Sequence, residues 1–321
     1  MPLPSTVHFD QLLTGVIVGA ENTELVAGEV LESVPSANLT GKIAKMGEDH
    51  FRINFDARRA KTPAFEVDYD VSSVSFEALE YAVEYPVDDQ DKAQYDDPFD
   101  ALADGAFVCE HKIMTRLEDL VATLLTTAAN YSAASKDATS RDWNVPATGV
   151  PVSDVSVGIE AIQDKTALPA SMIHGVCSHK VFRWLRLNDE VKESYLATSP
   201  GEGSLGVMNK EKVALALGLA SLTVGSAIKI TSKKGVTAVK APIWGTDKFL
   251  IYGKSGGRVN RLRPELGFII RPTIEGFPSG INALVDRYRR ERIKSDVVRA
   301  TGMIDQVIAN DQFGFLYDDI L

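Results

Sequence analysis

The longest run of periodic apolar positions lies between residues 98 and 131. Apolar or small side chains recur there at steps of three and four residues, at Leu102, Ala106, Cys109, Ile113, Leu117, Leu120, Leu124 and Ala128. This spacing places them on one face of an α-helix. Asp97 is a suitable N-cap, and Pro98 suits the first helical position. The pattern therefore predicts one helix over 98–131, about 50 Å long, on which other elements are assembled.

Residues 46–86 show a different pattern, in which apolar and polar residues alternate. Such alternation runs through 51–55, 65–71 and 81–85, and it is typical of β-strands. A turn near Arg58–Pro63 predicts that the strands form a hairpin ribbon. Because an isolated two-stranded ribbon is marginally stable in water, we expect this ribbon to rest on a neighbouring molecule. The alternative is that it pairs into the main sheet.

The remaining segments predict an α+β protein without a separate C-terminal domain. Residues 1–45 contain short apolar runs broken by glycine and proline, which indicates an extended arm with one short helix near His8–Leu13. We expect the later elements in this order: a loop at 132–152 around Trp143, a helix from a Ser153 cap, a strand at 171–177, a helix capped by Ser178, a further helix from Asn188, a glycine-rich loop at 199–206, a helix at 210–217, strands at 222–230 and 242–252, and strands through 281–321.

Charge is unevenly distributed along the 321 residues. The net charge of −10 argues against a general nucleic-acid binder. Between Glu66 and Glu110 there are fourteen acidic residues and one basic residue, whereas Lys229–Arg299 contains sixteen basic residues and six acidic ones. This polarity suggests either two solvated faces, or an acidic part of one copy that meets the basic part of another.

The two cysteines, Cys109 and Cys177, are too few for a disulfide framework and fit a reducing cytoplasm. The N-terminal stretch lacks a basic region and a long apolar run, so we expect no signal peptide and no transmembrane segment. His174, Cys177 and His179 form the most ligand-like cluster. However, residues three apart on a strand point to opposite faces and His179 falls on the next helix, so we expect no metal there. Four aspartates also lack the spacing of a calcium-binding loop: Asp88, Asp89, Asp96 and Asp97.

Sequence motifs for catalysis are absent as well. The tripeptide GKS at Gly253–Ser255 resembles the end of a phosphate-binding loop, but Lys248 stands where that motif needs glycine. The loop at 199–206 lacks the spacing of a dinucleotide-binding turn, and no G-x-S-x-G or H-E-x-x-H stretch occurs. Three glutamates at near-helical spacing indicate a solvated face: Glu77, Glu80 and Glu84. We therefore predict no enzyme activity, no cofactor, and no catalytic, cofactor-binding or metal-binding residue.

Four segments, taken in order, resemble parts of one known family. They are residues 57–89, 98–125, 150–193 and 224–253, the last of which ends in the run IWGTDKFLIYG. The family is that of the major capsid proteins of tailed bacteriophages. The resemblance implies the α+β Hong Kong 97-type capsid fold, with these parts: an N-terminal arm at 1–45, an extended E-loop ribbon at 46–86, a peripheral domain at 87–172 with a spine helix at 98–131, an axial domain at 173–280, and C-terminal strands at 281–321 that return to the peripheral domain.

The resemblance also implies a function. A chain of this family is a structural subunit that self-assembles as hexamers and pentamers into an icosahedral head enclosing double-stranded DNA. The implied location is the virion, after assembly in the bacterial host cytoplasm. The implied partners are further copies, a scaffolding protein, the portal, a decoration protein and packaged DNA bound without sequence specificity, and no membrane is involved.

Two alternatives remain open at this point. One is a nanocompartment shell protein of the same fold that encloses protein cargo, and the other is a cytoplasmic α+β enzyme with an unrecognised site. Some family members join an E-loop lysine to an asparagine of a neighbour. Lys61 is suitably placed for this, but no matching asparagine or assisting acid is evident, so we predict no cross-link.

The predicted tip of the ribbon is basic, with Arg58, Arg59 and Lys61 close together. Because clustered like charges repel, we expect a partner for them. The acidic stretch Glu66–Glu110 of an adjacent subunit would supply carboxylates, which arginine can bind in pairs. DNA phosphates are the competing partner, but the resemblance implies that the E-loop lies on the outer side of the shell.

Overall fold

The computed structural model describes residues 25–46, 53, 57–58, 62–64, 66, 71–93, 98–198, 208–254, 265–273 and 283–321. Its helices are α2 (Ala27–Val30), α3 (Asp89–Lys92), α4 (Pro98–Thr126), α5 (Pro151–Thr166), α6 (His179–Leu187), α7 (Asp189–Thr198) and α8 (Lys210–Ala216). Short 3-10 turns lie at Ala128–Asn130, Ala133–Ser135, Ala170–Met172, Glu291–Ile293 and Asp311–Phe313. Its strands are β1 (Glu32–Ser36), β2 (Thr40–Met46), β3 (Val71–Glu77), β4 (Leu79–Asp88), β5 (Lys136–Asp137), β6 (Ile173–Ser178), β7 (Ser221–Gly225), β8 (Ile228–Ile230), β9 (Lys240–Pro242), β10 (Phe249–Gly253), β11 (Gly267–Pro272), β12 (Leu284–Arg290), β13 (Ser295–Ile308) and β14 (Gly314–Tyr317).

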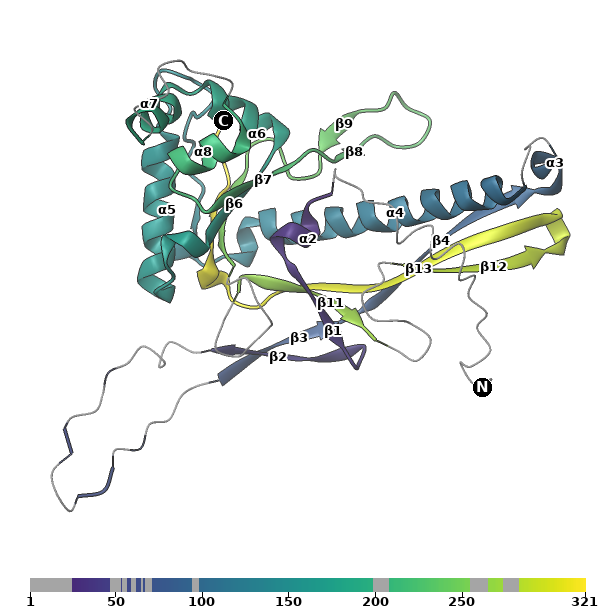
Figure 1. Ribbon diagram of the computed structural model, residues 1–321, viewed down its shortest axis with the longest axis horizontal. Coiled ribbons are helices and arrows are strands. Elements are labelled where there is room, and N and C mark those ends of the chain that lie inside the picture. Colours follow the sequence, from purple (N-terminus) through teal and green to yellow (C-terminus); the bar gives the residue numbers. More distant parts are fainter. Residues whose placement is uncertain are drawn as a thin grey trace.

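A long sheet runs beside helix α4 (Figure 1). Its order is β1-β11-β13-β12. Strand β4 also pairs with β13, along the edge opposite β12. The antiparallel pairing of β4 with β13 joins Leu79–Asp88 to Ser295–Ile304, while β1 runs parallel to β11. Apolar residues of β13 pack under α4, where the Cys109 thiol lies 3.8 Å from the Val298 carbonyl oxygen. This sheet and α4 together form the elongated body of the subunit.

A second sheet, of order β5-β14-β10-β6-β7, lies at the C-terminal end of α4. Helices α5, α6, α7 and α8 surround it, and we call this part the lobe (Figure 1). The lobe has its own apolar core, in which Trp143 is fully buried and donates from Nε1 to Asp154 Oδ2 at 2.7 Å. The lone tryptophan of the predicted loop is therefore a core residue.

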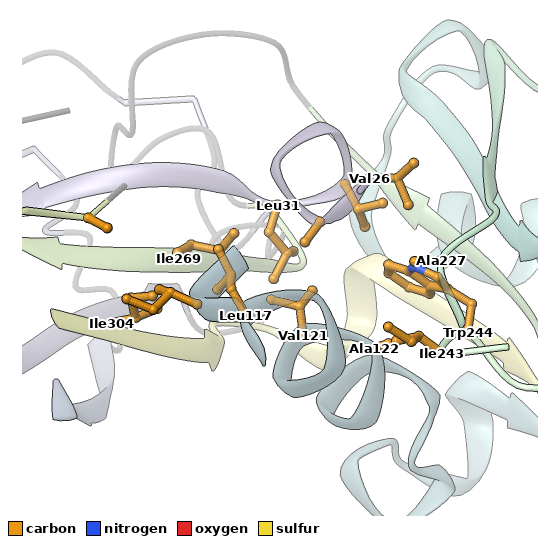
Figure 2. Packing of buried hydrophobic residues seen from close by; sticks show 14 of the residues in the cluster. Val26, Leu31, Leu117, Val121, Ala122, Ala227, Ile243, Trp244, Ile269 and Ile304 are labelled. Carbon is orange, nitrogen blue, oxygen red and sulfur yellow. The ribbon is translucent and has the colours of Figure 1, made fainter. Parts of the chain in front are cut away.

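The core of the body extends along α4 and beneath α2. Figure 2 shows Leu117 and Val121 of α4 gathered with Leu31, while Trp244 lies near Val26 at the lobe end. Gly105 has a specific place here, because a Cβ atom at this position would lie 2.9 Å from a ring carbon of Tyr85. The single glycine of the long helix thus lets β4 approach it closely.

Helix α4 is five residues shorter than predicted and ends at Thr126. Thr127 is already extended, with φ −87° and ψ 111°. Three side chains satisfy the last carbonyl groups of the helix: Asn130 bonds Leu124, Tyr131 bonds Leu125, and Lys248 bonds Thr126. Because these partners lie beyond the helix or 122 residues away, the apolar pattern contained no sign of the stop.

The buried face of α4 follows the predicted positions as far as Leu117 and then shifts by one residue. Val121 and Leu125 are fully buried, whereas Leu120 and Leu124 are only half-buried. From Cys109 onwards the buried positions follow steps of four residues, and each such step turns about 40° around a helix of 3.6 residues per turn, so the buried face turns around α4 towards its C-terminal end. The expected core position of Leu124 was wrong for this reason.

The start of α5 also differs from its prediction. The helix begins at Pro151, and Ser153 is not its cap. The carboxylate of Glu190, on α7, accepts from the backbone N–H groups of Val152 and Ser153 at 2.8 and 3.2 Å. A carboxylate from another helix thus supplies the negative charge that a helix N-terminus favours.

Strand pairing divides the chain differently from the expected segments. The ribbon consists of β2 and β3. Strand β4, which contains the last part of the predicted ribbon, lies in the main sheet, so for this part the alternative of pairing into the main sheet holds. Strand β14 pairs with β10 in the lobe, and α5 packs there too. The names arm, peripheral domain and axial domain describe places in a shell, and for this chain they remain predictions.

Candidate assembly surfaces

Two polar contacts attach the described part of the β2–β3 ribbon to its own subunit, one at each end. Glu77 donates its backbone N–H to Asp305 Oδ2 at 2.8 Å, and Lys45 Nζ lies 3.4 Å from Asp311 Oδ1. None of the ribbon side chains that the structure describes is buried. A ribbon without buried side chains gains little stability from its own subunit, which favours contact with another molecule.

Two of the three residues of the predicted basic tip, Arg59 and Lys61, lie outside the described residues. Arg58 is described, and its Nε donates to the Thr62 carbonyl oxygen at 2.5 Å. This contact across four residues fits a turn at the predicted place. The docking of the tip on an acidic neighbour remains a prediction.

Part of the charge polarity is neutralised within the subunit, which neither sequence alternative had anticipated. Arg289 forms a bidentate ion pair with Asp89, in which both N–O distances are 2.6 Å. Arg290 Nη2 donates to Glu84 Oε2 at 2.7 Å. These pairs join the acidic stretch of β4 and α3 to the basic end of β12. The antiparallel sheet brings the two stretches together although they are about 200 residues apart.

Asp296 lies at the centre of this network. Burial opposes its ionisation, but hydrogen bonds from Lys92 and Arg287 outweigh burial and lower its pKa to about 2. Arg289 Nη1 lies 3.4 Å away on the other carboxylate oxygen. The cluster fixes the far end of the body and leaves fewer free carboxylates for a neighbour.

Glu118 is a structural residue that the sequence pattern did not reveal. It is completely buried on α4, where it accepts from the backbone N–H groups of Val26 and Ala27 at 3.0 and 2.7 Å and from Trp244 Nε1. Burial raises its pKa, against these hydrogen bonds. Glu118 thereby attaches both the N-terminal segment and the lobe to the middle of α4. Glu118 is followed directly by Asp119, and the sequence does not show which of the two acids is buried.

The ligand-like cluster does not come together. His174 is half-buried, with Nδ1 2.7 Å from Ser221 Oγ; Cys177 is buried in the lobe core; and His179 is exposed at the start of α6. Burial and the charge of Lys254 lower the pKa of His174. Within the described residues, no three His, Cys, Asp or Glu side chains are arranged to hold a metal ion.

The other candidate motifs have structural surroundings. Gly253 ends β10, and Lys254 Nζ donates to the Glu29 carbonyl oxygen. Glu77, Glu80 and Glu84 lie on strands instead of a helix. Three sets lie outside the described residues: Asp96 and Asp97, Ser255, and the loop at 199–206. Among the described helices, none combines the length and apolar character of a bilayer-spanning segment.

The chain is similar to known proteins over nearly its whole length. The chain is 25% identical over 319 residues to the major capsid protein of Burkholderia phage BcepMu, covering 97% of this chain and 96% of that protein. A phage-related protein of Bordetella bronchiseptica RB50 has a TM-score of 0.72 at 18% identity, with 98% of each chain covered. The capsid of cyanophage P-SCSP1u has a TM-score of 0.61 at 10% identity, covering 93% of this chain and 89% of that chain. No family model matches.

An encapsulin from Synechococcus elongatus PCC 7942 shares the fold as well, with a TM-score of 0.54 at 12% identity and coverage of 100% of this chain and 92% of that chain. At such identities the structural matches establish the fold. The recognition from the order of elements is confirmed: the chain is a homologue of phage major capsid proteins and has the Hong Kong 97-type capsid fold.

Proposed function

We propose that this protein is the major shell subunit of a phage head. The full-length match to a phage major capsid protein carries this proposal. In this role the chain is a structural protein and not an enzyme. None of the side chains described for the ribbon is buried, and this supports the same role because such a ribbon needs a neighbour.

Copies of the subunit assemble as hexamers and pentamers that close into an icosahedral shell. Contacts in such rings are heterologous, so different surfaces of one chain meet on successive copies. The shell encloses double-stranded DNA without reading its sequence and forms in the bacterial host cytoplasm. A scaffolding protein, a portal and a decoration protein are the further partners that this function implies.

Sedimentation of the purified chain at micromolar concentration, followed by negative-stain microscopy, tests the function. We expect closed particles or capsomers, either alone or with co-expressed neighbouring phage genes. A monodisperse monomer under all these conditions would contradict the proposal.

The second candidate is a nanocompartment shell, which the shared fold with an encapsulin favours. The contents of purified particles distinguish the two functions. Nuclease-protected DNA is expected of a phage head, whereas a stoichiometric protein cargo without DNA would favour the nanocompartment.

A further inference from the structure

The hairpin of β8 and β9 exposes apolar side chains. Ile228 and Ile230 are 50% and 62% exposed, and Val236 and Val239 near the tip are 68% and 58% exposed. The two isoleucines lie two residues apart on one face of β8. Between them, Lys229 points the other way and pairs with Asp119 of α4 at 2.6 Å. The hairpin is thus fixed to the body on one face and left apolar on the other.

The same hairpin carries unpaired positive charge. Lys233, Lys234 and Lys240 are exposed and have no ion pair within the described residues. Lys240 lies opposite Ile230 in the strand register, so cationic and apolar groups share the free face. A two-stranded hairpin with such a face is marginal by itself. A partner for it should be both apolar and acidic.

Helix α5 presents such a surface. Its exposed side chains Ser153, Val157, Glu160 and Asp164 follow steps of four, three and four residues, which places them on one face. Val157 is 57% exposed, and neither Glu160 nor Asp164 has an ion pair within the described residues. This face is complementary to the hairpin in both apolarity and charge.

The two surfaces lie on opposite sides of the lobe. Figure 1 shows α5 along one edge and the β8–β9 hairpin projecting from the other. A pair of complementary surfaces that face away from each other cannot meet within one chain. Placed head to tail, they join successive copies, and a constant rotation between copies closes a ring.

We propose that the β8–β9 hairpin of one subunit docks on the exposed face of α5 of the next subunit in the ring. Val236 and Ile230 pack near Val157, while Lys233 and Lys234 face Glu160 and Asp164. This inference rests on the proposed function as a shell subunit. It adds a contact within the capsomer that is separate from the ribbon, and complementary charge sets its direction and register.

Charge exchange tests the contact. Lys233→Glu with Lys234→Glu should reduce the yield of assembled particles at least several-fold, and Glu160→Lys with Asp164→Lys should do the same. Combining all four changes should restore assembly, because the pairs are re-formed with opposite polarity. The matched control is Arg183→Glu with Arg186→Glu, which reverses two exposed arginines on α6 of the same lobe. It should assemble better than the Lys233/Lys234 variant and better than the Glu160/Asp164 variant. Circular dichroism confirms that each subunit is folded.

Disulfide trapping provides a second test that leaves the charges intact. Val236→Cys with Val157→Cys, oxidised with glutathione disulfide, should give a ladder of linked subunits on a non-reducing gel. The native thiols do not compete, because Cys109 and Cys177 are buried. Val236→Cys with Leu215→Cys, which places the second thiol on exposed α8, should give no ladder.

The outcomes separate this inference from the proposed function. Wild-type particles with no ladder, and with normal yield from both charge variants, would overturn the docking while leaving the shell function intact. A wild-type chain that never assembles would overturn both. Rescue by the four-fold exchange together with the ladder would establish the contact.

Discussion

The main sheet and the β2–β3 ribbon are both built from alternating strands, yet only the sheet is held by its own subunit. In β13, Val298 and Ala300 are completely buried beneath α4. In the ribbon, no side chain that the structure describes is buried. The difference lies in what covers the strands and not in the strands themselves. Residues under α4 stabilise the subunit, and residues of the ribbon are left to stabilise an assembly.

The largest expected effect comes from the covered side. Leu117→Ala should reduce the free energy of unfolding by about 2–5 kcal/mol, because Leu117 is 2% exposed in the core of α4. Leu124→Ala is the matched control, and with a half-buried side chain it should cost about half as much. Urea denaturation followed by circular dichroism measures both. Equal effects would mean that the observed shift of the buried face is wrong.

The next largest effect on the free energy of unfolding is expected from a buried acid on the same helix. Glu110 is 8% exposed and has no hydrogen-bond partner among the described residues, and burial raises its pKa from 4.5 to about 7. An acid with a raised pKa in the folded state makes stability fall as the pH rises from about 4.5 to about 7. Glu110→Gln should therefore add about 1–3 kcal/mol at pH 8 and little at pH 4. Asp104→Asn, exposed on the same helix, should change neither value, and a pH-independent gain for Glu110→Gln would contradict this account.

The ion network at the end of the sheet has a smaller expected effect with the opposite pH dependence. The pKa of Asp296 is lowered to about 2, so its contribution is present above pH 3.8 and is lost as the pH falls towards 2. Asp296→Asn should cost about 1–2 kcal/mol at pH 7, and the difference should shrink at pH 3. Asp189→Asn, which breaks an exposed pair with Lys192, should cost less than about 1 kcal/mol. Thermal melts at pH 3, 5 and 7 provide the comparison.

The ribbon should show the smallest effect per contact. Arg58→Glu with Arg59→Glu should leave the folded subunit unchanged and weaken assembly, since an exposed pair contributes only ~0–1 kcal/mol and is repeated at every subunit. Circular dichroism and particle yield at low and high salt measure the two properties. Normal particle yield at every salt concentration would refute electrostatic docking of the tip.

The internal ion pairs also narrow the search for the partner of this tip. Within Glu66–Glu110, Glu84 and Asp89 are already paired, whereas Glu80 and Asp104 are exposed without an ion pair in the described residues. Glu80→Lys should therefore partly restore assembly of the double variant. Glu84→Lys, its counterpart on the same strand, should not.

Local patterns in the sequence predicted elements well and predicted partners poorly. Three predictions that depend on neighbouring residues agree with the structure. They are the start of α4 at Pro98, the Ser178 cap of α6, and the separation of His174 from Cys177. The end of α4 depends on Lys248, and the cap of α5 depends on Glu190. Such long-range contacts leave no periodic signal.

Long-range contacts also decide which charged residues on the candidate assembly surfaces are already paired. Counting charges identified an acidic and a basic stretch, but the pairing of β4 and β12 with β13 brings some of these charges together within one chain, such as Glu84 with Arg290 and Asp89 with Arg289. Glu118 was missed because its partners are Val26, Ala27 and Trp244, distant in sequence on both sides. The order of the elements, which needs no contact information, was sufficient to identify the fold.

The position of β13 and β14 also has a consequence for the timing of folding during translation. Strand β13 is the strand on which β4, β11 and β12 all pair, and β14 lies between β5 and β10 in the lobe. A ribosome that has released only the first 290 residues has therefore supplied neither of these strands. Contacts between residues this far apart in sequence form slowly and late. A nascent chain therefore completes neither the main sheet nor the sheet of the lobe until its last strands have left the ribosome.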